Sequence, residues 1–71
     1  MNTTPRPTVD ELLNLALQKE ETARDFYAKL AQGCQIDFVR ELLEQLANEE
    51  EKHVHMIRNM QARLHVGKKP A

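Results

Sequence analysis

The chain has little of what usually stabilises a small domain by itself. It has 71 residues and one cysteine, Cys34, so no disulfide can form within it. A chain of this length buries only about 60% of the surface that its unfolded form exposes. Small domains usually gain further stability from disulfides, a metal ion or a partner chain. With internal disulfides excluded, we expect a metal site, an oligomeric interface or both.

The chain also has few aromatic residues, a small net charge and no long apolar run. Phe26, Tyr27 and Phe38 are the aromatic residues, and the net charge is −1. The lack of a basic patch argues against nucleic-acid binding. No apolar segment approaches the roughly 18 residues of a membrane span, and residues 1–7 lack the apolar core of a signal peptide. The single thiol fits a reducing compartment, so we expect a cytoplasmic protein.

Helix signals occupy most of the chain. Thr8 and Glu11 form a capping box, which is typical of a helix start, and Gly33 is a typical C′ residue that stops a helix. We predict one domain over residues 1–71, with a flexible arm (1–7), a first helix (8–32), a second helix (36–65) and a tail (66–71). The short connection makes the helices antiparallel, so the predicted fold is an all-α two-helix hairpin.

Both predicted helices carry a heptad-like seam, with alternating steps of four and three residues. The seams are Val9, Leu13, Ala16, Glu20, Ala23, Tyr27 and Leu30 in the first helix, and Val39, Leu43, Leu46, Glu50, His53, Ile57, Met60 and Leu64 in the second. This spacing suits helices packed in a left-handed bundle. Further apolar positions widen each stripe beyond what one neighbouring helix covers. The hairpin is therefore expected to form a homodimer, a four-helix bundle, or a higher homo-oligomer.

Three ionisable residues interrupt the seams at one level. Glu50 and His53 form an E-x-x-H pair, and Glu20 lies within about 3 Å of the height of Glu50 at 1.5 Å per residue from the turn. Such groups on a core face cost free energy unless they are compensated, and a metal ion compensates two carboxylates and an imidazole. These donors suit iron, and manganese or zinc would also fit. One chain supplies half of a dinuclear site, which a two-fold dimer completes.

Two segments resemble the rubrerythrin-type ferritin-like proteins. In residues 16–31, Glu20 precedes Tyr27 by seven residues and a Leu-Ala pair follows. Residues 46–53, Leu-Ala-Asn-Glu-Glu-Glu-Lys-His, look like the second helix of the same family. The resemblance covers roughly residues 9–60, and it implies that Glu20, Glu50 and His53 are metal ligands.

The number of predicted helices shows which members of this family the chain resembles more. The chain has two helices instead of four and lacks the Cys-x-x-Cys pairs of a rubredoxin-like iron site, so it is closer to the encapsulated ferritins. Their plan implies two iron ions per dimer and oxidation of Fe²⁺ to Fe³⁺ with O₂ or peroxide, for iron storage or detoxification. Glu20, Glu50 and His53 would act in catalysis through the metal. Residues 64–71 have a faint likeness to a peptide that docks such proteins inside an encapsulating shell protein.

Two other functions remain open from the residues alone. A non-enzymatic metal-binding module, or a helical dimer stabilised by metal, would use the same ligands. A metal-free helical interaction protein would use the seams only as a dimerisation surface.

Several residues near the predicted site also keep two interpretations. Tyr27 is either a core aromatic residue or a second-shell partner of a ligand carboxylate. Glu49 either faces solvent or guides cations towards the site. His55 and His65 are expected to lie away from the metal, and Cys34 is expected to be a partly buried loop residue.

Overall fold

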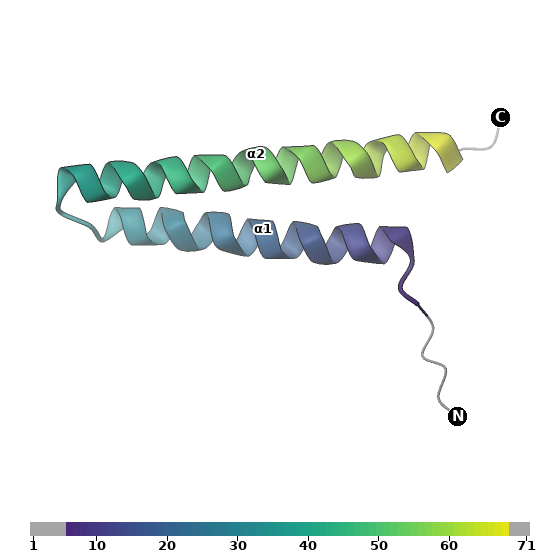
Figure 1. Cartoon of the computed structure of the whole chain (residues 1–71), viewed down its shortest axis with the longest axis horizontal. Helices are drawn as coiled ribbons and strands as arrows, with labels where there is room; N and C mark the ends of the chain where they lie inside the picture. Colours follow the sequence, from purple (N-terminus) through teal and green to yellow (C-terminus); the bar gives the residue numbers. More distant parts are fainter. Residues whose placement is uncertain (1–5, 69–71) are drawn as a thin grey trace, which may run out of the picture.

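Two antiparallel helices make up the computed structural model (Figure 1). The structure describes residues 6–68, and their side chains as far as residue 65. Helix α1 spans Val9–Gln32 and helix α2 spans Asp37–Lys68. The predicted all-α two-helix hairpin is therefore confirmed. Neither described helix has an apolar stretch that could cross a membrane.

The capping box predicted at the start of α1 is present. The Thr8 backbone N–H donates to Glu11 Oε1 at 2.7 Å, and the Glu11 N–H donates to Thr8 Oγ1 at 3.1 Å. These bonds satisfy two backbone donors that the first turn of a helix would otherwise leave unpaired. Asp10 and Glu11 also place negative charge in that turn, where the helix dipole favours it.

Gly33 ends α1, but in a different conformation from the one a C′ glycine typically adopts. Its φ of −90° and ψ of −1° lie in the right-handed region, where the left-handed conformation is usual for that position. Its N–H donates to the carbonyls of Lys29 and Leu30 at 3.3 and 3.2 Å. Because the amide is satisfied in this geometry, the turn does not require the conformational freedom of glycine.

Helix α2 continues to Lys68, three residues beyond the predicted end at 65. Gly67 does not stop it, since one glycine costs a helix only about 1 kcal/mol. The first five residues of the predicted arm and residues 69–71 of the tail lie outside the described residues. Residues 69–71 are also the last three of the segment that has the likeness to a docking peptide.

The contact between α1 and α2 is not centred on the predicted seams. Among the described residues, the buried hydrophobic side chains are Ala31 and Val54, which are 4% and 0% exposed, and neither belongs to a seam. Seam residues Val9, Leu30 and Met60 are instead exposed by 56, 43 and 44%. Most of the other seam residues are half-buried, so the seams lie along one side of the hairpin, where a single chain covers them only in part.

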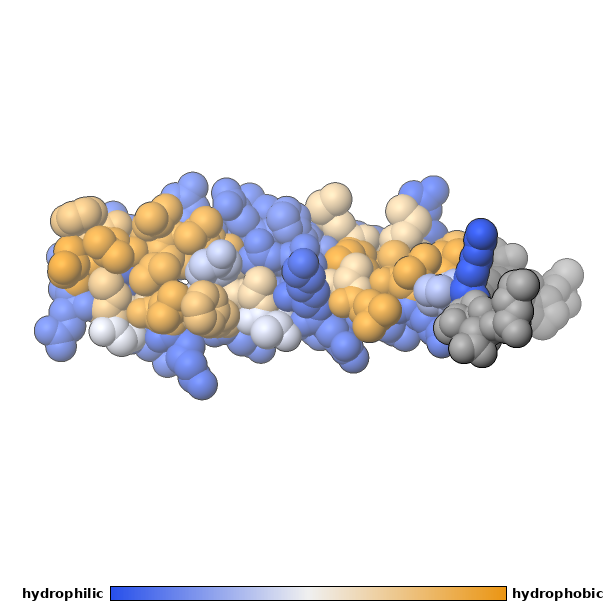
Figure 2. Space-filling view, turned by 60° about the horizontal axis from the view of Figure 1, so that its bottom comes forward, coloured by the Kyte–Doolittle hydropathy of each residue, from blue (hydrophilic) through white to orange (hydrophobic). Residues whose placement is uncertain are grey.

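That uncovered side carries most of the large apolar residues. Those exposed by more than two fifths are Val9, Leu12, Leu15, Phe26, Leu30, Ile36, Phe38, Leu42, Met56 and Met60. Figure 2 shows hydrophobic side chains gathered in two areas along the length of the hairpin, with hydrophilic side chains between them. We call this surface the apolar face. Large apolar side chains gathered on one exposed face are typical of an interaction surface.

Candidate metal centre

The three residues predicted to bind metal converge at the middle of the hairpin. Glu20 comes from α1, while Glu50 and His53 come from α2. His53 Nδ1 lies 3.4 Å from Glu20 Oε2 and 3.7 Å from Glu50 Oε2. One ligand atom of each residue lies within 4.8 Å of those of the other two, so the cluster has the size of a metal site.

Helix geometry accounts for this convergence. Residues three apart on a helix are neighbours on its surface, which places His53 one turn above Glu50 on the same side of α2. The antiparallel packing of α1 brings Glu20 opposite both. The side chains of Glu20 and Glu50 are 29 and 20% exposed, whereas that of His53 is 51% exposed. The cluster is thus open on one side.

Each of the two carboxyl groups shifts the pKa of the other. A hydrogen bond from Glu50 lowers the pKa of Glu20, with further lowering from His53. The reciprocal hydrogen bond raises the pKa of Glu50, with desolvation and the negative charge of Glu20 adding to the effect. Two carboxylates this close favour one shared proton. A cation that enters between them would replace that proton and remove their repulsion.

A set of ion pairs next to the cluster was not predicted from the sequence. Arg24 Nη1 donates to Glu51 Oε1 at 2.8 Å, and Arg58 Nη2 donates to Glu21 Oε2 at 2.7 Å. Arg24 lowers the pKa of Glu51, and the pKa of Arg24 rises in turn. The available signal was the doubling of acidic residues, since Glu20 and Glu50 are each followed directly by a second glutamate.

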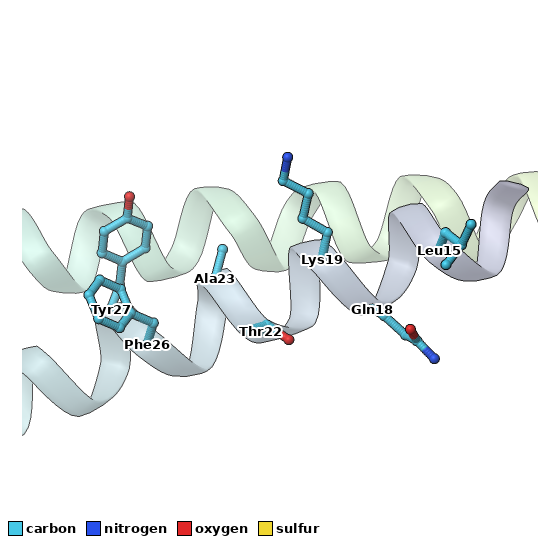
Figure 3. A pocket seen from close by; sticks show the side chains of 7 residues that line it. All are labelled: Leu15, Gln18, Lys19, Thr22, Ala23, Phe26 and Tyr27. Atoms are coloured by element: carbon cyan, nitrogen blue, oxygen red, sulfur yellow. The ribbon is translucent and has the colours of Figure 1, made fainter.

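Tyr27 lies beside a shallow hollow formed by α1 alone. The hollow has a volume of about 560 Å³, and Figure 3 shows the Tyr27 hydroxyl and the Lys19 amine projecting to the same side of it. The Tyr27 ring meets Phe26 edge to face, with centroids 5.5 Å apart. Within the described residues, no hydrogen bond joins Tyr27 to the Glu20 cluster, so its role beside a ligand stays a prediction.

The remaining candidate residues lie apart from the cluster. Glu49 is exposed on α2. His55 Nε2 lies 3.1 Å from Glu51 Oε2, and His65 Nε2 lies 4.0 Å from Asp10 Oδ1. Cys34 is half-buried in the loop, with a free thiol 3.6 Å from the Ile36 carbonyl oxygen. The expected partly buried position of Cys34 is confirmed.

Comparison with known protein families shows the family to which this hairpin belongs. The family model described as Rubrerythrin matches residues 11–71, which is most of the chain. The chain belongs to the rubrerythrin family. Membership implies ferritin-like iron binding, and rubrerythrin proteins often act as oxidoreductases. Searches of curated proteins and of solved structures find no match.

The cluster in this rubrerythrin-family chain fits iron in its chemistry. It offers carboxylate oxygens from Glu20 and Glu50 and an imidazole nitrogen from His53, a donor set that iron accepts readily. The raised pKa of Glu50 shows that this place is unfavourable for a second uncompensated negative charge. A positive ion is the simplest group to relieve it.

Proposed function

We propose that two copies of the chain form a four-helix bundle with a di-iron centre between them, and that this centre oxidises Fe²⁺ to Fe³⁺. The observation that carries the proposal is the convergence of Glu20, Glu50 and His53, whose ligand atoms lie within 4.8 Å of one another. Membership of the rubrerythrin family supports iron as the metal.

The ligand count supports a second copy. Ferritin-like dinuclear centres use one glutamate from each of two helices and a Glu-x-x-His pair from each of the other two. One hairpin provides Glu20 and the Glu50–His53 pair, which is half of that set. A two-fold axis through the cluster would provide the other half, and two-fold symmetry is the commonest arrangement in homo-oligomers.

The apolar face supports the same partner. Leu12 and Leu42 are 52 and 53% exposed on the two helices, on the side where the seams and the cluster lie. A second copy would bury these side chains and surround the open side of the cluster with apolar residues. With a net charge of −1 per chain, repulsion between two copies is small. Larger rings and an encapsulating shell protein stay predictions for further partners.

The side chains have distinct roles in this proposal. Glu50 would bridge or chelate the metal, Glu20 would be a terminal or bridging carboxylate, and His53 would supply the nitrogen. The proton shared by Glu20 and Glu50 would leave as Fe²⁺, the substrate, enters. Bound iron supplies the electrons: two Fe²⁺ give two electrons, which with two protons reduce O₂ to hydrogen peroxide, or hydrogen peroxide to water. The protein contributes position, charge and exclusion of water.

An anaerobic titration with Fe²⁺, followed by exposure to air, tests the proposal. We expect saturable binding, then the absorbance of ferric iron on oxidation. Glu50→Gln should remove both, whereas Glu41→Gln, the same change at an exposed position of α2, should preserve both. If the wild-type protein binds no iron, the proposal is wrong.

Binding without oxidation would favour the non-enzymatic alternative. In that case the cluster would serve as a carrier or as a metal site that stabilises the dimer. A protein that dimerises but binds no metal would instead be the helical interaction protein that the seams alone allow.

A further inference from the structure

Two ion pairs join the helices directly beside the proposed ligands. Glu21 follows Glu20 on α1 and accepts a hydrogen bond from Arg58 on α2 at 2.7 Å. Glu51 follows Glu50 on α2 and accepts one from Arg24 on α1 at 2.8 Å. Each helix therefore contributes one acidic and one basic residue, and the two bridges cross the hairpin in opposite senses.

Helix geometry couples these bridges to the cluster. Consecutive residues of an α-helix point about 100° apart, since a turn holds 3.6 residues. In each pair of adjacent glutamates, one carboxylate therefore reaches the cluster and the next reaches an arginine of the other helix. A rotation or slide of either helix that moved Glu20 away from Glu50 would also break the bridges of Glu21 and Glu51.

The apolar contact between the helices is only partly buried. Within the described residues its buried members are Ala31, near the loop, and Val54, next to His53. Other apolar residues along it, such as Leu43 and Ile57, are half-buried. Apolar burial is non-directional, so this contact fixes the register of the helices less sharply than directional bonds do. Charged hydrogen bonds have a preferred geometry, and two of them at different heights restrain both rotation and sliding.

We propose that Glu21–Arg58 and Arg24–Glu51 are positioning pairs that hold Glu20, Glu50 and His53 in register for metal binding. This inference rests on the proposed metal function. The pairs are 28 to 52% exposed, and exposed ion pairs contribute little to the stability of a fold. Their main effect is therefore on the geometry of the ligands.

A cobalt titration of Arg24→Gln tests the inference. The substitution removes a positive charge near the cluster, so electrostatics alone predicts tighter binding of Co²⁺. Loss of positioning predicts weaker binding, by about tenfold, which is the lower end for residues that orient metal ligands. The change in affinity, read from the visible absorption of bound Co²⁺, therefore separates the two effects by its sign. Equal or tighter binding would overturn the inference.

Exchanging the charges of Arg24 and Glu51 tests whether restoring the ion pair restores metal affinity. Arg24→Glu should weaken Co²⁺ binding further, and adding Glu51→Arg should recover part of the affinity by restoring the bridge in reverse. Recovery is expected to be partial, because Asp25 and His55 also contact the native pair at 3.0 and 3.1 Å. If the swap recovers nothing, the bridge is not the cause.

The experiment also needs a control variant, a check that each variant is folded, and the wild-type protein for comparison. Gln61→Ala removes another hydrogen bond between the helices, the one to Asn14 Oδ1 at 2.8 Å, but away from the cluster, and should leave the affinity unchanged. Circular dichroism shows whether each variant stays helical; if Arg24→Glu unfolds, the comparison of Arg24→Gln with Gln61→Ala decides. A wild-type protein that binds no Co²⁺ contradicts the proposed function itself, whereas binding that Arg24→Gln does not weaken contradicts only the positioning role.

Discussion

Glu20 and Glu50 face each other across the hairpin, and each shifts the pKa of the other in the opposite direction. The pKa of Glu20 is lowered and that of Glu50 is raised, in both cases chiefly by the hydrogen bond between their carboxyl groups. Without a cation, ionising both carboxyl groups is unfavourable. The pair therefore links the stability of the hairpin to pH and to metal, and both links can be measured.

Glu50→Gln should stabilise the metal-free protein at neutral pH and have little effect at acidic pH. A carboxyl group whose folded pKa is raised stabilises the fold below its unfolded pKa, and this stability is lost as the pH rises through the folded pKa. For Glu50 that loss begins near its ordinary pKa of 4.5 and is complete above its raised value. Glutamine cannot ionise, so it avoids the loss. Thermal melts of both proteins in chelator, from pH 4 to 8, would check this, and a difference that shrinks with rising pH would contradict it.

Metal should raise the melting temperature of the wild-type protein and leave that of a ligand-free variant unchanged. Binding to the folded state alone adds about 2.7 kcal/mol at a metal concentration of 100 Kd. Glu20→Ala combined with His53→Leu removes two of the three donors in the cluster. Differential scanning calorimetry with Fe²⁺ under argon, and again after adding chelator, measures the effect. An equal rise in both proteins would place the metal elsewhere.

Val54→Ala should destabilise the fold by about 2 kcal/mol, because it removes methyl groups from a fully buried site. Helicity followed during urea denaturation gives the free energy of unfolding. Arg63→Ala, at an exposed position of the same helix, is the control and should stay within about 0.5 kcal/mol of wild type. If the two variants unfold alike, Val54 is not at the centre of the contact between the helices.

Leu42→Glu should prevent the proposed dimer from forming while preserving the hairpin. Leu42 is 53% exposed in the single chain, so a charge there meets solvent until a second copy covers the apolar face. Sedimentation velocity would report the change in mass, and circular dichroism would report the helices. Glu41→Gln, one residue away and exposed, should leave the mass unchanged. A wild-type protein that sediments as a monomer with metal present would contradict the dimer.

The sequence predicts the hairpin well because its signals are local. The capping box at Thr8 and the lack of glycine and proline within α1 depend on neighbouring residues only. Glu20 and Glu50 lie at a similar height along the hairpin, and this also follows from the number of residues between each of them and the short turn. For the same reason the sequence alone predicts that the three proposed ligands lie together.

The contact between the helices could not be predicted in the same way. A heptad pattern marks the positions of a helix that pack against any neighbouring helix. It does not show whether that neighbour belongs to the same chain or to another copy. Val9, Leu30 and Met60 fit the pattern yet remain exposed, while Ala31 and Val54 lie outside it and are buried. Arg24 and Arg58 read as ordinary surface charges, because their partners are set by the rotation of both helices.

The adjacent glutamates have a consequence for how the gene can vary. In each doublet (Glu20-Glu21 and Glu50-Glu51), the two carboxylates differ only in their direction around the helix axis. One points to the cluster and the other to an arginine. Many substitutions on the outer surface would leave these directions unchanged. Deleting one codon between the loop and either doublet would turn that doublet by about 100° relative to the other helix, and its carboxylate at the cluster would then point elsewhere. Among relatives, we therefore expect length changes to gather in the connection between Gly33 and Ile36 and to be rare within the helices.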